Sequence, residues 1–195
     1  MVTVGLMPLL LAMAVPPPHP DLRRQDSYAI YSLLLPGQLW RNMDPSQTQR
    51  WAIAGTTVSA TDINPALAPE AALKAPPDHP QWFQDAVQDY NARKSHRVPL
   101  IRAFQTDRPY LLLTPSEVDE FKSLRTSMNA SSTLGDKYSG IPGITYFSEV
   151  YFNPTRTGAL VYMLDWCGNM CSQAEWVYLD KENGQWVRRS GAGSS

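Results

Sequence analysis

The chain has 195 residues, 43% of them hydrophobic, and its six Trp and nine Tyr supply enough large side chains for one buried core. Its 17 Lys and Arg nearly balance its 18 Asp and Glu, so the formal net charge is -1. Nucleic-acid binding normally requires a clustered basic surface, and this balance therefore argues against a nucleic-acid partner.

The N-terminal residues 1–15 form an apolar run that is followed at once by a Pro-rich stretch. The run is shorter than the about 20 residues that a membrane-spanning helix needs. It predicts a signal peptide over residues 1–14, with Ala12-Met13-Ala14 as the cleavage site. No Lys or Arg precedes the run, so an uncleaved anchor or a misassigned start codon is the alternative. We expect an exported protein, periplasmic or secreted, with no integral membrane segment beyond this leader.

Proline is concentrated in the first 80 residues, which predicts a loop-rich region whose order depends on packing against the rest of the chain. We divide the sequence into a Pro-rich leader at 15–25, one α+β domain at 26–190 and a flexible tail at 191–195.

Two helices are predicted in the first half of the domain. Asp26-Ser27 has the residues of an N-cap and predicts a short helix that runs to Leu34. Asp78-His79-Pro80 opens the best amphipathic helix of the chain. Its apolar face is formed by Trp82, Phe83, Ala86, Val87 and Tyr90.

A third helix follows Thr114-Pro115-Ser116-Glu117, which has the residues of a capping box. It should run from Pro115 to about Leu124 and bury Val118 and Phe121. The residues before it predict extended chain at 51–59, 98–105 and 110–113.

From Ile144 onward, short aromatic and β-branched runs alternate with turn residues. The predicted strands are 145–152, 159–166, 175–180 and 185–189. The fold class is therefore α+β: an antiparallel β-sheet that ends in a C-terminal four-strand meander, packed by two or three short helices.

The strand motifs Phe147-Ser-Glu-Val-Tyr-Phe-Asn153, Gly158-Ala-Leu-Val-Tyr162, Cys167-Gly-x-x-Cys171 and Leu179-x-Lys-x-x-Gly-x-Trp186 form a series. This series resembles the C-terminal ends of a group of uncharacterised exported bacterial proteins. The resemblance covers roughly the last fifty residues. It implies the meander and export, and it implies no activity, ligand or catalytic residue.

Cys167 and Cys171 are the only cysteines, and they flank a predicted turn. The Cys-x-x-Cys spacing and helix N-terminus of a redox pair are absent, and two sulfurs provide only half of a zinc site. A structural disulfide is the interpretation that we favour in an exported protein, with free thiols or a metal or redox role as alternatives.

The three histidines, His19, His79 and His96, have no evident catalytic partner in the sequence. His96 is the best candidate for a general base, because Asp85, Asp89 and Ser95 precede it within a predicted helix or at its end. A solvated residue at a helix end is the simpler interpretation.

The carboxylates suggest no catalytic pair. Glu117 is explained by the capping box, and Asp119 and Glu120 by a charged first turn. Glu149, Asp165 and Glu175 lie in or beside the meander. Asp165 is the least expected of them, because it interrupts an apolar strand.

Strand alternation places Tyr162 and Trp166 on one face of their strand, and Trp176 and Tyr178 on one face of the next. If this aromatic face is open, it is a platform for a glycan or a partner chain. If helices cover it, these four side chains belong to the core.

No motif in the sequence determines the function, and two hypotheses remain. We favour a non-enzymatic exported or cell-envelope protein that binds a partner protein or a glycan through a sheet face, with Tyr162, Trp166, Trp176 and Tyr178 as its binding residues. The alternative is a small secreted hydrolase with a His/carboxylate site. No residue pattern predicts a cofactor or a metal.

Export has a direct test. If Ala14 precedes the cleavage site, N-terminal sequencing of protein expressed with its leader in a bacterial host should begin near Val15 in the periplasmic fraction. Intact Met1 in cytosolic protein would contradict export and would remove the compartment in which a disulfide is expected.

Overall fold

The computed structural model describes residues 20–44, 48–62, 68–126 and 136–189. The predicted signal peptide, His19 and the predicted tail lie outside the described residues. None of the helices in these four ranges is both long and apolar enough to cross a membrane.

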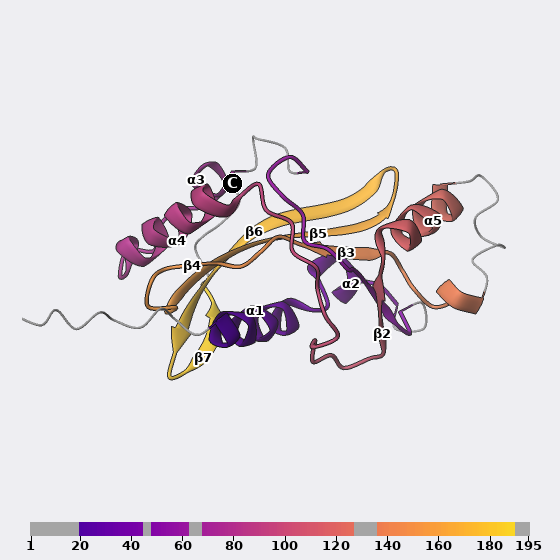
Figure 1. The fold of residues 1–195 in the computed structure, drawn as a ribbon. Helices are drawn as coiled ribbons and strands as arrows, with labels where there is room; N and C mark the ends of the chain where they lie inside the picture. The colour runs from indigo at the N-terminus through magenta and orange to yellow at the C-terminus, as the bar shows by residue number, and fades with distance from the viewer. Residues whose placement is uncertain (1–19, 45–47, 63–67, 127–135, 190–195) are drawn as a thin grey trace, which may run out of the picture.

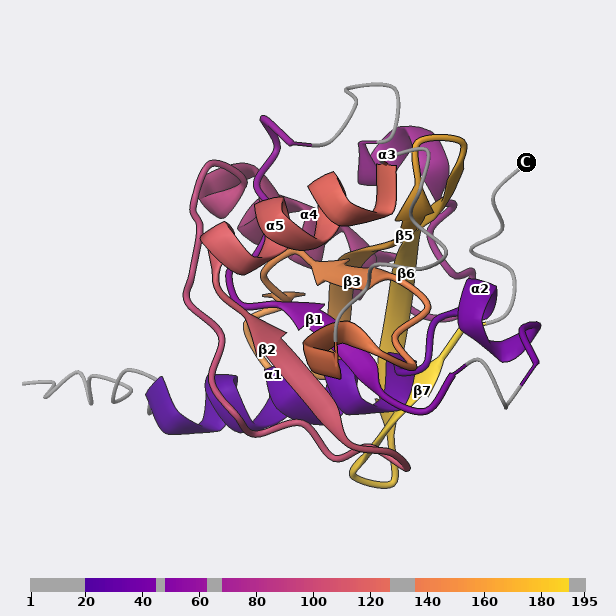
Figure 2. The same cartoon turned by 90° about the vertical axis from the view of Figure 1, so that its right-hand side faces the viewer.

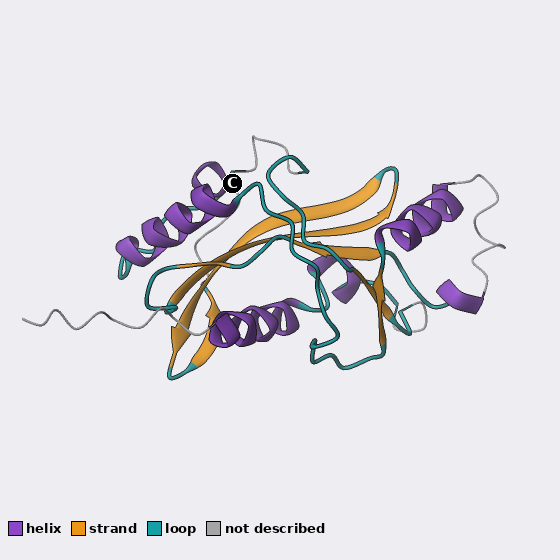
Figure 3. Ribbon diagram, viewed as in Figure 1, coloured by secondary structure: helices purple, strands orange, loops and turns teal. Residues whose placement is uncertain are grey.

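A seven-stranded mixed sheet forms the centre of the fold (Figure 3). Its strands are β1 (Trp51–Ala54), β2 (Tyr110–Leu113), β3 (Ile144–Phe147), β4 (Tyr151–Phe152), β5 (Gly158–Gly168), β6 (Cys171–Glu182) and β7 (Gln185–Arg188). The strand order is β2-β1-β3-β5-β6-β7, and β4 pairs with β5. The α+β class and the C-terminal meander are confirmed.

One part of the sheet differs from the antiparallel expectation. β1 pairs in parallel with both β2 and β3. Parallel neighbours need a crossover connection, and the chain provides two of them between β1 and β3. The helices in these crossovers are α3 (Pro69–Ala72), α4 (Pro80–Arg93) and α5 (Pro115–Thr126).

The helices form a layer on each side of the sheet. α3, α4 and α5 lie over one face and α1 (Pro20–Leu34) lies over the other (Figures 1 and 2). Strand alternation produces this division: Leu160 and Tyr162 of β5 pack in the core under α4, whereas Ala159 and Val161 pack in the core against α1. Two short helical segments, α2 (Gln38–Arg41) and Asp136–Tyr138, complete the set.

The predicted start of α1 was wrong. The helix begins at Pro20, so Asp26 and Ser27 lie in its middle rather than at an N-cap. Ser27 Oγ donates to the Arg23 carbonyl one turn earlier. Asp26 Oδ1 accepts from Lys181 Nζ at 2.5 Å and from Trp186 Nε1 at 3.1 Å. Asp26 therefore binds the C-terminal strands and does not cap the helix.

The capping box of α5 is confirmed. Thr114 N donates to Glu117 Oε2 at 2.8 Å, and Glu117 N donates to Thr114 Oγ1 at 3.3 Å. The two residues thus satisfy each other's backbone donors at the point where β2 passes into α5.

Two predicted extended runs differ from strands. The run 98–105 makes a single isolated bridge, between Thr56 and Pro99, and Pro99 has no N–H to continue a ladder. The run 145–152 is divided into β3 and β4 by Ser148. Ser148 Oγ accepts from Tyr162 N at 2.9 Å and donates to the Glu149 carbonyl, so the side chain replaces part of the ladder.

Cys167 and Cys171 form a disulfide across the hairpin between β5 and β6, with their Cα atoms 5.1 Å apart. Gly168 pairs with Cys171, so the turn consists of Asn169 and Met170 rather than the three residues between the cysteines.

Replacement of both cysteines with Ser should lower the free energy of unfolding by only about 2 kcal/mol, because the closed loop is small. Urea unfolding of the variant and the parent protein measures this difference. Alkylation of the native protein without reductant should leave both cysteines unmodified, and full alkylation or retained stoichiometric zinc would contradict the disulfide.

Candidate functional site

The predicted aromatic face is mostly covered. Tyr162, Trp176 and Tyr178 are 4%, 4% and 1% exposed, because α4 packs over them. Trp166 is half-buried near α5, with its ring centroid 6.4 Å from that of Phe121. These four side chains therefore form no open platform, and the interpretation that helices cover them describes the structure.

A cleft of about 380 Å³ remains on this face, between the first turns of α5 and the chain that follows β1. Tyr146 of β3 and Leu164 of β5 lie in its lining. Ala54 and Leu113, the last residues of the parallel strands β1 and β2, also line it. The carboxyl ends of parallel strands are where open α/β sheets usually bind ligands.

The wall of the cleft that α5 forms carries one negative and one positive side chain. Asp119 and Lys122 both line the cleft, and their i, i+3 spacing places them on one side of the helix. Lys122 Nζ lies 5.1 Å from the ring centroid of Tyr146 and 5.6 Å from that of Trp166. The ammonium is thus held over two aromatic rings, and Trp166 contributes to the site indirectly.

Tyr146 is the least satisfied polar residue of the cleft. Its side chain is 8% exposed, and its hydroxyl has no hydrogen-bond partner among the described residues. Burial raises the pKa of Tyr146 far above its usual value, and the nearby negative charge of Asp119 raises this pKa further. The phenol therefore stays neutral and keeps an O–H group to donate.

The opposite rim is held by an ion pair. Arg97 and Asp62 approach to 2.5 Å, and Asp62 Oδ2 accepts from Ser59 N at 2.7 Å. Thr57 Oγ1 accepts from Val98 N at 2.8 Å, which fixes the chain next to this rim. The rim charges thus neutralise each other.

The cleft offers both donors and acceptors to a ligand. Asp119 accepts, Lys122 and Tyr146 donate, and Val118 and Leu164 provide an apolar wall. No histidine or cysteine is among the described residues that line it. The arrangement suits a neutral ligand with many hydroxyl groups better than it suits a single strong charge.

The histidine site proposed from the sequence is not assembled in the described residues. His96 is exposed, and its backbone N–H donates to the Arg93 carbonyl. Asp85 accepts from Gln81, and Asp89 is paired with Arg23 at 2.7 Å. Ser95 is exposed. His79 stacks on Trp82, with ring centroids 3.9 Å apart.

The other acids that the sequence suggested have structural partners. Glu120 accepts from Tyr138 at 2.6 Å, and Glu175 pairs with Arg188 at 2.6 Å. Glu149 is 6% exposed and forms a two-point ion pair with Arg93. Within the described ranges, no three acidic, His or Cys residues are grouped so that they would hold a metal ion.

Asp165 is 1% exposed, and none of its partners among the described residues is a cation. Its Oδ1 accepts from Thr145 Oγ1 at 2.7 Å, and Thr145 in turn accepts from Trp40 Nε1. Gly37 lies against Oδ2 so closely that a Cβ would overlap it. Burial raises the pKa of Asp165 to about 6.

Sequence reasoning missed Tyr146, Lys122 and Arg97 as site residues. The sequence places Tyr162 and Trp166 on one face of their strand, but only the pairing of β3 with β5 brings Tyr146 opposite Leu164 on that face. Lys122 follows Val118 by one helical turn, so it lies on the side of α5 that faces the sheet. A cation at such a position was the one sign in the sequence that could have pointed to the site.

Comparisons of the chain with protein-family models, with curated proteins and with solved structures found no match. The candidate function therefore rests on the geometry alone.

The raised pKa of Asp165 predicts a pH dependence of stability. Its folded-state pKa of about 6 exceeds the usual 3.8, so the folded protein holds this proton more tightly between the two values. The free energy of unfolding should therefore fall by about 3 kcal/mol as the pH rises from about 4 to about 6, and then level off.

Urea unfolding between pH 4 and 7 of the parent protein and of Asp165→Asn isolates this contribution, because all other groups titrate in both. The difference between the two proteins should change with pH only in that window. A difference that is constant across the range would show that Asp165 is ionised throughout.

Proposed function

We propose that the protein is a non-enzymatic, exported protein that binds a glycan in the cleft between α5 and the chain that follows β1. The observation that carries the proposal is the buried, unpartnered hydroxyl of Tyr146 in a cleft that also contains Asp119 and Lys122. A buried polar group without a partner costs free energy, and a ligand hydroxyl would supply that partner.

The chemistry of a sugar matches both walls. Each sugar hydroxyl both donates and accepts, so neighbouring hydroxyls can bind the Asp119 carboxylate and the Lys122 ammonium together. The apolar C–H face of the ring fits against Val118 and Leu164. The volume of about 380 Å³ lies within the usual range for small-molecule sites.

Export is part of the same proposal. The disulfide between Cys167 and Cys171 supports it, because disulfides persist in oxidising compartments. A periplasmic or secreted location would bring the cleft into contact with envelope or extracellular glycans.

The proposal predicts opposite effects of one substitution on stability and on binding. Tyr146→Phe removes a hydroxyl that has no partner, so the free energy of unfolding should stay the same or rise by about 1 kcal/mol. Affinity for a sugar identified on a glycan array should fall roughly five-fold in calorimetric titration.

Lys122→Met should weaken the same binding by roughly ten-fold, because it removes a charged donor and keeps the apolar stem. Lys94→Met is the matched control, since Lys94 Nζ lies 5.7 Å from the ring centroid of Tyr90, outside the cleft. Failure of every arrayed glycan to bind, or NMR shifts that spare Val118 and Leu164, would refute the proposal.

A further inference from the structure

The polar side chains of the glycan cleft place a hydrogen-bond donor beside an acceptor. The Tyr146 hydroxyl is buried, has no partner among the described residues and stays protonated, because burial and the negative charge of Asp119 both raise its pKa. The same electrostatic effect places the Asp119 carboxylate near the phenol. Asp119 is exposed, and its carboxylate accepts hydrogen bonds without donating any. The ligand group that complements this pair has an acceptor next to a donor.

Apolar side chains surround this donor and acceptor. Ala54 and Leu113 line the cleft and are 4% and 1% exposed, and the partly buried Val118 and Leu164 line it as well. Ala54 and Leu113 belong to the same core cluster as Tyr146, and the other two pack against that cluster. A ligand group that reaches the Tyr146 hydroxyl therefore meets apolar surface, and it gains affinity if it also has an apolar end.

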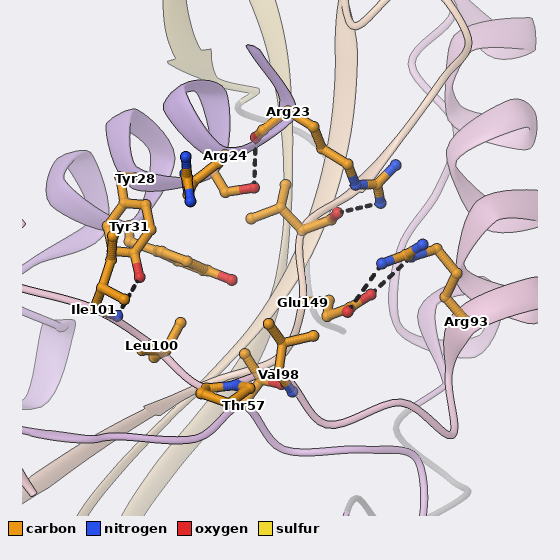
Figure 4. A pocket seen from close by; sticks show the side chains of 13 residues that line it. Arg23, Arg24, Tyr28, Tyr31, Thr57, Arg93, Val98, Leu100, Ile101 and Glu149 are labelled. Carbon is orange, nitrogen blue, oxygen red and sulfur yellow. Dashed lines mark hydrogen bonds and ion pairs between the residues drawn. The ribbon is translucent and has the colours of Figure 1, made fainter. Parts of the chain in front are cut away.

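A second cleft, of about 270 Å³ and lined in part by α1, differs in this respect (Figure 4). Its Glu149 accepts from Arg93 Nε at 2.8 Å, and its Tyr28 hydroxyl accepts from Ile101 N at 2.6 Å. None of the described side chains in its lining has a buried polar atom without a hydrogen-bond partner, whereas the glycan cleft has the Tyr146 hydroxyl. Of these two clefts, the glycan cleft is the one that presents a buried polar group to a ligand.

The acetamido substituent of a sugar combines the features that the glycan cleft complements. Its carbonyl oxygen accepts, its N–H donates, and its methyl group is apolar. The substituent projects from the ring, so it can reach a buried phenol while the ring stays nearer the mouth of the cleft. A ring hydroxyl could also accept from Tyr146 and donate to Asp119, but it would bring no apolar group to Leu113.

We propose that the glycan bound in this cleft carries an N-acetylamino sugar. The Tyr146 hydroxyl donates to the acetamido carbonyl, the Asp119 carboxylate accepts from the acetamido N–H, and the methyl group packs against Ala54 and Leu113. Lys122, which also lines the cleft, donates to the ring hydroxyls. The inference rests on the proposed glycan-binding function and specifies which kind of sugar is recognised.

A glycan array and calorimetric titration of the full-length protein test this preference. The arrayed glycans that bind should carry an N-acetylamino sugar. In titration, the tighter binder of N-acetylglucosamine and N-acetylgalactosamine should bind roughly ten-fold more tightly than the same sugar with a hydroxyl in place of the acetamido group. Its N-formyl analogue, which lacks the methyl group, should bind roughly four-fold more weakly than the N-acetyl sugar.

Two variants test the assigned contacts through the preference for the acetylated sugar, measured as the ratio of the two affinities. Tyr146→Phe and Asp119→Ala should each lower this ratio roughly three-fold, because each removes one hydrogen bond to the acetamido group. Asp119 is exposed, so its variant should fold like the parent protein. Asp85→Ala is the matched control and should leave both affinities unchanged, since Asp85 accepts from Gln81 outside the cleft.

The results separate this inference from the glycan-binding function itself. If arrayed glycans bind but the acetylated and unacetylated sugars have equal affinities, the acetamido assignment is overturned and the glycan function stands. An unchanged ratio in both Tyr146→Phe and Asp119→Ala would also overturn the assignment. If no arrayed glycan binds, the glycan function fails and this inference fails with it.

Discussion

The antiparallel pairing of β5 with β6 is the constraint on which the rest of the structure depends. The register runs from Gly158 opposite Asp180 to Gly168 opposite Cys171, which makes it the longest ladder of the sheet. Because side chains alternate along β5, this one register divides the apolar residues between two cores, one under α4 and α5 and one against α1. A slip of one residue would exchange the two faces. The glycan cleft is lined by Leu164 of β5 and by Tyr146, which pairs with it from β3.

The interruption at Ser148 connects the two faces. There Tyr162 N–H donates a hydrogen bond to the Ser148 hydroxyl. In a regular strand this N–H would donate to a backbone carbonyl instead. The chain is thereby released from β5 for the next residues, and Glu149 reaches Arg93 at the end of α4. The ion pair ties α4 to the chain between β3 and β4. The Ser-Glu dipeptide of the strand motif is thus explained by geometry, without a catalytic role.

Features that depend on neighbouring residues were predictable from the sequence, whereas features that depend on contacts between distant segments were not. The meander was predictable because alternation and turn residues such as Asn183-Gly184 act over a few positions, and Asn183 and Gly184 both adopt positive φ. The capping box of α5 was predictable for the same reason.

Asp26 was misassigned because its partner Lys181 lies 155 residues away. The parallel pairing of β1 was also beyond local signals, since four-residue strands look alike in either orientation. Tyr146 and Lys122 meet only after β3, β5 and α5 are assembled, and the candidate site therefore had no compact sequence motif.

The buried polar groups of this protein are satisfied in different ways, and the differences separate structure from function. Glu149 has a guanidinium partner, and Asp180 lies 3.2 Å from Arg189 Nε. Asp165 has hydroxyl, indole and backbone donors but no cation in contact among the described residues, and burial therefore raises its pKa. In each case the fold itself provides the compensation. The hydroxyls of Tyr146 and Tyr178 are both buried without a hydrogen-bond partner among the described residues, but Tyr178 belongs to the core under α4, whereas Tyr146 lines a cleft. Folding leaves the Tyr146 hydroxyl without a hydrogen-bond partner, and a ligand hydroxyl in the cleft would supply one. Phenylalanine would fill the same volume without this cost. Binding, rather than stability, is therefore the physical reason to retain a tyrosine at this position.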